Sequence, residues 1–388
     1  MKKISSLFLS VLIVVFAMSS VNFSAVATEN KDKSQAEPSV SAQAFILYCA
    51  DNGQIIYSKN ENDKMKPAST TKLMTTLLAL EEADSSNKVV TFSKDMIAEG
   101  SSIYMKIGDK LTLKDLAAGM MMASGNDAAN ATAIAISGSK EKFANQMTDK
   151  AKQIGMKNTH FVTPSGLDDD NHYSTAYDLA VLMDYALENE EFAKLTGQKS
   201  AEIKFIEPAG KQNIYANHNR LLSMYEYCIG GKTGYTMSAG RCLVSAAKKD
   251  ELTLICVTLN DRNDWEDHKN LYEYGFSQVM CHKTNDKDFV VDVPCVGGED
   301  NNSDCITVAG EKDLSIILPV ADKSKLKRKI LLDNFLYAPI KENDIVGKIE
   351  YLIDDKIIDS VNILAVDTIN VSKNKNLFNI IKDLFTYG

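Results

Sequence analysis

The chain has 388 residues, a formal net charge of −9 and seven cysteines. This acidic composition, without any basic stripe, disfavours a nucleic-acid-binding function. The length predicts two domains once an N-terminal leader is set aside.

At the N-terminus, residues 1–27 have the pattern of a secretory signal peptide. Two lysines precede an apolar run from Leu7 to Met18, and the small residues before the expected cleavage site end at Ala27. A transmembrane anchor is the weaker alternative, because the apolar run is shorter than the roughly 20 residues that a bilayer requires. Cleavage removes two lysines and no acid, which changes the formal charge from −9 to −11. We therefore expect the mature protein outside the cytoplasm.

Residues 28–41 are polar and poor in apolar side chains, which predicts a disordered leader. The apolar run that starts at Ala44 and the run that ends near Tyr57 then flank the turn residues Asp51-Asn52-Gly53. This arrangement predicts a β-hairpin.

Helical periodicity dominates residues 69–190, most clearly in 113–122 and 127–136. A further helix is expected to begin at Thr175, because Thr followed three residues later by Asp resembles a capping box. The pattern then returns to strands at 241–247 and 252–259. Strands, helices and then strands that can complete one sheet predict an α+β domain over residues 42–288, with its site between layers.

Residues 289–371 consist of short β-branched runs broken by turns, and they predict a small all-β domain. The last segment, 372–388, restores a helical pattern in which Leu377, Ile381 and Leu384 share one apolar side. This amphipathic helix is too short to span a bilayer. It either docks on a membrane surface or packs on the all-β domain.

The seven cysteines contain no Cys-x-x-Cys pair and no metal-ligand spacing. Cys242 and Cys256 lie in apolar strand-like runs, so we expect them to be buried. Cys295 and Cys305 flank a polar loop and could form a disulfide, a question that the sequence leaves open.

A candidate nucleophile lies in the stretch KPASTTKLMT, where Ser69 stands three residues before Lys72. On a helix this spacing puts both side chains on one face, with Cβ atoms about 5–6 Å apart. Pro67 suits a helix start, where free backbone N–H groups would stabilise an oxyanion. Because Ser-x-x-Lys also occurs elsewhere in the chain, its meaning depends on partner residues.

Two further motifs supply such partners. Ser124-Gly125-Asn126 interrupts two helical segments and can direct a hydroxyl and an amide inward, although Ser-x-Asn also recurs. Lys232-Thr233-Gly234 occurs once and opens a strand. It does not end a phosphate-binding loop, because Glu226 stands where that loop requires glycine.

Ser-x-x-Lys, Ser-x-Asn and Lys-Thr-Gly in this order are similar to the motif set of penicillin-binding proteins and class A β-lactamases. With the leader, the trailing β domain and runs such as PSGLDDDNHYSTAYDLA and GGKTGYTMSAGRCLVSAA, the chain resembles the D-alanyl-D-alanine carboxypeptidases of the low-molecular-mass penicillin-binding protein type, serine peptidase family S11, over residues 40–370. The resemblance implies a β-lactamase/transpeptidase-like domain, with an antiparallel sheet, helices and a helical subdomain, before the β domain.

The resemblance also implies the roles of the motif residues. Ser69 is the nucleophile that attacks the carbonyl of the penultimate D-alanine, and Lys72 is its base. A lysine with the ordinary pKa of about 10.4 cannot accept a proton at neutral pH. Burial and the neighbouring cation of Lys232 are expected to lower the pKa of Lys72. The lysine thereby takes the place of a histidine base.

Other motif residues are implied to move protons and bind substrate. Ser124 would pass a proton between Lys72 and the leaving amine, and Asn126 would hydrogen-bond the substrate peptide. Lys232 and Thr233 would receive the free C-terminal carboxylate, which restricts cleavage to the last residue.

Backbone geometry completes the implied site. Gly234 would let the substrate backbone approach the strand, and the N–H groups of Ser69 and Tyr235 would form the oxyanion hole. No histidine lies in a metal or triad motif. His172 and His218 stay open between a structural role and lining of the site.

Three alternatives remain beside the carboxypeptidase. A β-lactamase shares the motifs, but the region 162–180 lacks a Glu-x-x-Leu-Asn motif, although Asp168 to Asp170 keep the question open. A cross-link endopeptidase of the same family is equally compatible with the motifs. A non-catalytic wall or β-lactam sensor is less favoured, because every catalytic position is intact.

The resemblance implies neither a cofactor nor a metal. The expected partners are a peptidoglycan stem peptide ending in D-Ala-D-Ala, β-lactam antibiotics and, through the C-terminal helix, a membrane surface. The expected location is the outer face of the cytoplasmic membrane.

Overall fold

The structure is a computed structural model that describes residues 36–298 and 305–372. The predicted signal peptide and residues 373–388 of the predicted C-terminal helix lie outside the described residues. Within the described ranges, no helix combines the length and the apolar character needed to cross a membrane.

A five-stranded antiparallel sheet forms the centre of the N-terminal region, which we define as residues 36–278. Its strands follow the order β2-β1-β9-β8-β7. The hairpin from the start of the region thus pairs with strands from its end, as the sequence predicted. The bounds are β1 Ala44–Cys49, β2 Ile55–Lys59, β7 Cys228–Thr236, β8 Gly240–Lys249 and β9 Leu252–Leu259.

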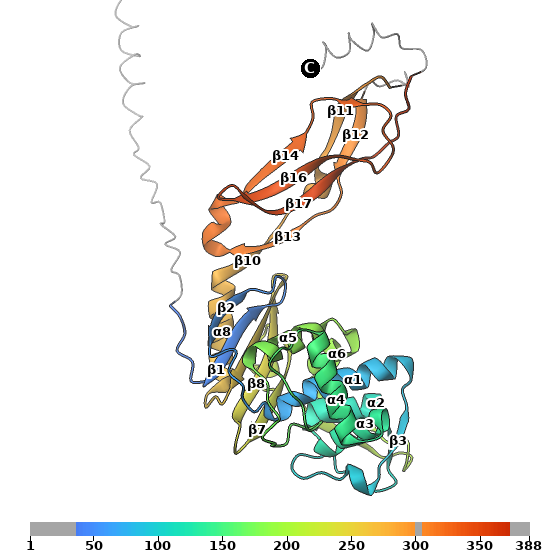
Figure 1. Cartoon of the computed structure of the whole chain (residues 1–388), viewed down its shortest axis with the longest axis vertical. Helices are drawn as coiled ribbons and strands as arrows, with labels where there is room; N and C mark the ends of the chain where they lie inside the picture. The colour runs from blue at the N-terminus through green and yellow to red at the C-terminus, as the bar shows by residue number, and fades with distance from the viewer. Residues whose placement is uncertain (1–35, 299–304, 373–388) are drawn as a thin grey trace, which may run out of the picture. The chain divides into compact units, whose positions relative to one another are not determined.

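Helices cover both faces of this sheet (Figure 1). On one face, α5 Ala176–Leu187 and α6 Glu190–Thr196 pack against the sheet, and α1 Lys72–Ser85, α2 Leu113–Ala123, α3 Asn126–Ser137 and α4 Lys140–Gln153 form a helical layer on the same side. On the other lies α8 Asp264–Gln278. Shorter elements are the 3₁₀ turns η1 Ala68–Thr71 and η2 Lys94–Met96, helix α7 Leu221–Met224, and the ribbons β3 Val89–Thr91 with β4 Lys110–Thr112 and β5 Ser200–Lys204 with β6 Gln212–Ala216.

The two faces of the sheet belong to two separate apolar cores. Successive side chains of a strand point to opposite faces, so Ile46 joins the core beneath helices α1–α6 while Leu47 joins the core beneath α8. The same alternation separates Val244 from Leu243 on β8. Every strand at the centre of the sheet is therefore buried on both sides, and the site lies where one layer meets the sheet edge.

Local signals in the sequence set several element boundaries. The side chain of Thr175 accepts a hydrogen bond from the backbone N–H of Asp178, which confirms the predicted helix start. The predicted break between two helices is also confirmed, because α2 ends at Ala123 and α3 begins at Asn126. The predicted disordered leader differs from the structure at its end, since the backbone N–H of Ser41 donates to Asp267 at 2.6 Å.

The C-terminal region, residues 279–372, is built from strands and 3₁₀ turns within its described part. A six-stranded sheet in the order β14-β16-β17-β12-β11-β15 encloses its own core around Val308, Ile349 and Ile363. Strand pairing begins before residue 289, because β10 pairs with β13. The bounds are β10 Val279–Lys283, β11 Val290–Val296, β12 Cys305–Gly310, β13 Ser315–Pro319, β14 Lys327–Leu332, β15 Leu336–Tyr337, β16 Ile345–Ile353 and β17 Lys356–Ala365, with η3 Asp286–Asp288 and η4 Val320–Lys325.

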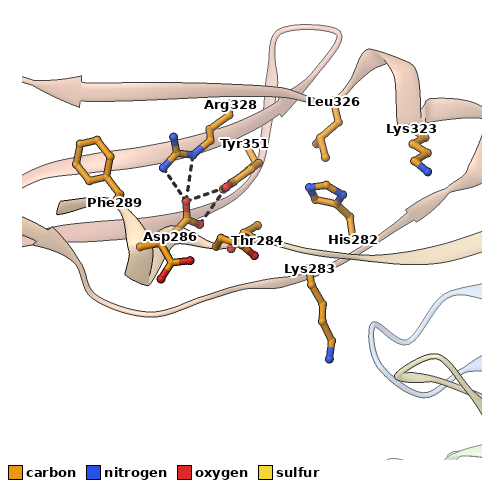
Figure 2. Close-up of a pocket in the computed structure, with 11 residues that line it drawn as sticks. His282, Lys283, Thr284, Asp286, Phe289, Lys323, Leu326, Arg328 and Tyr351 are labelled. Atoms are coloured by element: carbon orange, nitrogen blue, oxygen red, sulfur yellow. Dashed lines mark hydrogen bonds and ion pairs between the residues drawn. The ribbon is translucent and has the colours of Figure 1, made fainter. Parts of the chain in front are cut away.

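A cavity of about 650 Å³ lies in this C-terminal region. Figure 2 shows the buried carboxylate of Asp286 between the side chains of Arg328 and Tyr351. The Arg328 Nε and the Tyr351 hydroxyl both donate to it, at 3.1 and 2.9 Å. The acid is fully buried and fully paired, and none of the predicted site residues lines this cavity.

Candidate active site

The predicted site residues come together around a second cavity, of about 470 Å³, in the N-terminal region. It lies between the turn η1, the break between α2 and α3, and the edge strand β7. The residues that line it are Ser69, Ser101, Ser124, His218, Thr233, Gly234, Tyr235, Arg241, Asp264 and Trp265.

Ser69 lies in the 3₁₀ turn η1, and Lys72 is the first residue of α1. The sequence predicted both on a helix start, and the tighter turn still brings Lys72 Nζ to 2.9 Å from Ser69 Oγ. Ala68, just before the serine, has a left-handed φ of 50°. A non-glycine residue in this conformation stores strain, which is found most often at functional sites.

Lys72 has three oxygen neighbours and no exposed surface. Besides Ser69 Oγ, its Nζ lies 2.7 Å from Asn126 Oδ1 and 2.7 Å from the Ser165 carbonyl. The amide and carbonyl oxygens can only accept hydrogen bonds, whereas the serine hydroxyl can also donate. A neutral Lys72 can therefore direct its two N–H groups to those oxygens and its lone pair to the Ser69 hydroxyl.

The electrostatics of the site favour this neutral form. Burial lowers the pKa of Lys72 well below its ordinary value of 10.5, the positive charge of Lys232 lowers it further, and Asp127 opposes the shift. Because the charged amine is poorly solvated here, the shift favours the neutral form that a general base requires. The predicted direction and both of its predicted causes are confirmed.

Lys232, on β7, is also buried, with 2% of its surface exposed. Its Nζ lies 3.1 Å from Ser124 Oγ and 2.8 Å from the Thr233 carbonyl. Burial lowers the pKa of Lys232 to about 7. In this structure its amine faces Ser124, and the predicted contact of Lys232 with the substrate carboxylate stays a prediction.

Ser124 occupies a left-handed position, with φ of 56°, at the end of α2. This conformation turns the chain sharply and places the hydroxyl in the cavity. The contact that the structure gives Ser124 Oγ is to Lys232. A proton path through Ser124 would therefore run beside Lys232.

Asn126 contacts the proposed base, and its predicted hydrogen bond to the substrate stays a prediction. Its Oδ1 accepts from Lys72 and its Nδ2 donates to the Glu99 carbonyl at 2.7 Å. Only 4% of the residue is exposed. Asn126 thus orients the Lys72 amine, and it is not among the residues that line the cavity.

Gly234 is required by packing. A Cβ at this position would lie 2.9 Å from Ser69 N and 3.0 Å from the Pro67 carbonyl, closer than carbon atoms ordinarily approach. The absence of a side chain lets β7 lie directly against the turn that carries Ser69. Since β7 is an edge strand, every second residue near Tyr235 directs its backbone N–H and C=O away from β8, where they are not used by the sheet.

The loop that contains Ser165 packs against the turn η1. It holds a second glycine, Gly166, that close packing requires. A Cβ on Gly166, whose φ is 81°, would lie 1.9 Å from the Ala68 carbonyl. His172 connects this loop to the turn η1. Its Nδ1 accepts from the Val162 and Thr163 N–H groups, and its Nε2 lies 2.9 Å from Thr71 Oγ1. Nε2 therefore carries the proton.

This arrangement resolves the open question about the two histidines. His172 is buried and has a structural role, and burial lowers its pKa to about 4. His218 lines the cavity, where burial and the charge of Lys232 lower its pKa below 6.5.

Sequence reasoning missed the pair Arg241 and Asp264, which line the cavity together with Trp265. Arg241 Nε and Nη2 donate to the Asp264 carboxylate at 3.1 and 2.5 Å. The hairpin that follows Lys-Thr-Gly could have predicted the position of Arg241, since the register of β7 and β8 places Arg241 opposite Tyr235. Asp264 had no such signal, because it comes from α8 on another element.

The arrangement suits acyl transfer by a serine nucleophile. A hydroxyl faces a buried amine in a cavity with cationic groups, and an edge strand offers backbone donors. In the described part of the chain, no group of three or more His, Cys, Asp or Glu side chains could hold a metal ion.

Comparison with known proteins gives a consistent result for both regions. A family profile described as D-alanyl-D-alanine carboxypeptidase matches residues 31–263, and one described as penicillin-binding protein 5, C-terminal domain, matches residues 282–371. The chain is 32% identical over 364 residues to the D-alanyl-D-alanine carboxypeptidase DacF of Bacillus subtilis, covering 92% of this chain and 91% of that protein.

Two further matches extend this result. The D-alanyl-D-alanine carboxypeptidase DacB2 of Mycobacterium tuberculosis is 36% identical over 248 residues, covering 62% of this chain and 84% of that protein. The solved structure of penicillin binding protein 5 from Haemophilus influenzae superposes with a TM-score of 0.65 at 28% identity, over 87% of this chain and 99% of that chain. The predicted fold class, an α+β transpeptidase-like domain followed by a β domain, is confirmed.

Proposed function

The chain belongs to the D-alanyl-D-alanine carboxypeptidase family, and from this premise we propose that it removes the terminal D-alanine of peptidoglycan stem peptides through an acyl-enzyme on Ser69. One observation carries the proposal. The Ser69 hydroxyl lies in the cavity, 2.9 Å from the amine of a buried lysine whose pKa is well below 10.5. This is the arrangement that a serine needs for activation without histidine.

Acylation begins with proton transfer from Ser69 Oγ to Lys72 Nζ as Oγ attacks the carbonyl of the penultimate D-alanine. The N–H groups of Ser69 and Tyr235 stabilise the oxyanion, and loss of one such donor typically reduces the rate about 10²–10³-fold. The C–N bond then breaks, and the leaving amine receives the proton through Ser124, which contacts Lys232. Water then attacks the acyl carbon and gives a proton to Lys72, the bond to Ser69 Oγ breaks, and the serine takes back a proton as the shortened peptide leaves.

A β-lactam would enter the same reaction, since it presents a strained amide and a carboxylate to the same nucleophile. Its ring-opened product stays attached to Ser69 as an acyl group. Retention of this group separates a penicillin-binding carboxypeptidase from a β-lactamase, which must remove it quickly.

The cavity gives little support to a β-lactamase. Among the described residues that line it, Asp264 is the one carboxylate, and it is tied to Arg241. Asp168, one of the acids left open by the sequence, instead accepts from Thr236 Oγ1 at 2.9 Å. A cross-link endopeptidase and a non-catalytic sensor differ from the proposal in turnover, which an assay decides.

The test is release of D-alanine from an acylated peptide ending in D-Ala-D-Ala, followed by mass spectrometry of the protein after labelled penicillin. We expect turnover and a single adduct on Ser69, both lost in Ser69→Ala. Ser324→Ala is the matched control, because Ser324 also precedes a lysine by three residues but lies in the C-terminal region. Label on another residue, or stable acylation without D-alanine release, would contradict the proposal.

We further propose that the protein acts outside the cytoplasm and that residues 372–388 bind reversibly to the membrane surface. The pattern of the N-terminus and the apolar side around Leu377, Ile381 and Leu384 support this. Truncation after Val371 should abolish co-sedimentation with anionic vesicles without lowering the thermal stability. A truncated protein that still pellets with vesicles would exclude the membrane role, and a less stable one would favour packing on the β domain.

A further inference from the structure

The proposed reaction requires a group that recognises the free carboxylate of the last residue, and the sequence assigned this to Lys232 with Thr233. Lys232 is nearly fully buried, and its amine is engaged with Ser124 and the Thr233 carbonyl. Of the described residues that line the cavity, the basic ones are Arg241 and His218. Arginine keeps its charge at any physiological pH, which histidine does not.

We infer that Arg241, held in place by Asp264, is the residue that binds the terminal carboxylate and makes the enzyme selective for a free C-terminus. This inference rests on the proposed function and assigns one substrate contact within it. Asp264 acts through Arg241 and is a positioning residue.

The position of Arg241 follows from the β7–β8 hairpin. Arg241 pairs with Tyr235 across the two strands, so both side chains leave the same face of the sheet as Thr233, two residues earlier. Diagonal neighbours of this kind have backbones about 7–8 Å apart, a span that a long arginine side chain covers. A carboxylate bound at the Thr233 hydroxyl therefore lies within reach of the guanidinium.

The orientation of the guanidinium is fixed before substrate arrives. Both oxygens of Asp264 accept from it, and the Arg241 guanidinium carbon lies 5.7 Å from the ring centre of Trp265. The Asp264 side chain is 4% exposed, whereas that of Arg241 is 44% exposed. Arginine has five N–H donors, so donors remain for a carboxylate in the planar, two-bond geometry that arginine favours.

Asp264 does not cancel the attraction for a substrate anion, because its own charge has a second partner. It lies in the first turn of α8, where the helix dipole stabilises negative charge, and its Oδ1 also accepts from the Trp265 N–H at 3.0 Å. The carboxylate thus serves as an anchor, and the exposed edge of the guanidinium faces the cavity that contains Ser69.

The experiment compares kcat/KM for an acylated peptide ending in D-Ala-D-Ala with that for its C-terminal amide. The wild-type enzyme should prefer the free acid. Arg241→Ala should reduce this preference roughly tenfold to a hundredfold, the range for a hydrogen bond to a charged group, chiefly through KM of the acid. Arg241→Lys should give an acid preference between those of the wild type and Arg241→Ala, because lysine keeps the positive charge but cannot donate two parallel hydrogen bonds to a carboxylate. Arg262→Ala, an exposed arginine nearby, is the matched control.

Asp264→Asn should lower the acid preference less than Arg241→Ala, because it loosens the guanidinium without removing it. An equal loss for acid and amide would show that the pair is merely structural and would overturn the inference. An unchanged acid preference in Arg241→Ala would overturn it as well.

A second readout separates this inference from the proposed function. Acylation by benzylpenicillin and by its methyl ester reports the carboxylate contact without turnover. If the wild type cleaves neither peptide, yet Arg241→Ala abolishes its preference for penicillin over the ester, the proposed function fails and the inference stands. If both preferences are unaffected by Arg241→Ala, the inference fails whatever the turnover.

Discussion

Two buried sites, one in each region of the molecule, differ in how their charges are partnered. In the C-terminal region, Asp286 has no exposed surface and accepts from Arg328 and Tyr351 (Figure 2). In the N-terminal region, Lys72 and Lys232 are just as buried, yet among the described residues neither forms a salt bridge with a carboxylate, and their neighbours are neutral oxygens.

The difference separates a structural role from a chemical one. A buried charge with a complete set of partners stays charged and rigid, whereas a buried charge without a counter-ion changes its protonation state. The pKa of Lys232 is lowered to about 7 by burial, and that of Lys72 is lowered by burial and by Lys232. Absence of a counter-ion is thus the physical origin of the proposed base.

The largest expected effect is that of Lys72→Met. Removing the base should slow penicillin acylation by about 10²–10⁴-fold, the usual contribution of general base catalysis. Thermal stability should change little, because the apolar chain removes a buried amine that has no counter-ion, which offsets the loss of a donor to Asn126 Oδ1 and the Ser165 carbonyl. Acylation rate and melting temperature measured on one preparation check both parts. Acylation at the wild-type rate would place the base elsewhere.

The next effect concerns His172, a buried base that is satisfied in its neutral form. Its pKa is about 4 in the folded protein and 6.5 when exposed, so the unfolded state binds more protons between these values. Stability should therefore fall as the pH decreases from 6.5 to 4, by about 3 kcal/mol from this residue. His172→Asn should remove this part of the loss, as denaturant unfolding at several pH values would show. His268, also buried, serves as the internal reference because both proteins retain it. An identical pH slope in both proteins would contradict this assignment.

In the C-terminal region, Asp286→Asn should lower the free energy of unfolding by about 1–3 kcal/mol. The substitution removes the charge that Arg328 and Tyr351 require, while the Ser69 site is untouched. The exposed Asp354→Asn, which removes a surface ion pair to Lys325, should change it by less than about 1 kcal/mol. Chemical denaturation checks both values. A lower acylation rate in Asp286→Asn would contradict the proposal that Asp286 has a structural role and does not affect the Ser69 site.

The smallest expected effect is a displacement of the pH profile in Lys232→Met. Because the charge of Lys232 lowers the pKa of Lys72, its removal should move the rise of the acylation rate to higher pH. The profile is measured with labelled penicillin from acidic to alkaline conditions. A profile that keeps its wild-type position would mean that burial alone sets the pKa of Lys72.

The sequence predicted those features that depend on local patterns. The hairpin of β1 and β2, the break at Ser124 and the helix start at Thr175 each have a signal within a few residues, and the structure confirms them. The ordered motifs also predicted that Ser69, Ser124 and Thr233 meet in one cavity.

The remaining features depend on contacts between distant elements. Nothing in Ser-x-Asn shows that the Asn126 amide contacts Lys72. The buried amine of Lys232 and the pairing of Arg241 with Asp264 likewise result from how β7, β8 and α8 pack together. Such contacts have no local signature, because they join residues from separate elements.

The most direct test of the account is an NMR titration of the lysine side chains, with Lys72→Met and Lys232→Met to assign the two buried signals. The account predicts that the Lys72 amine loses its proton well below 10.5 and that the Lys232 amine does so at about 7, while surface lysines stay charged. If the Lys72 signal titrated together with the surface lysines, the serine would lack a neutral base and the central claim would be contradicted.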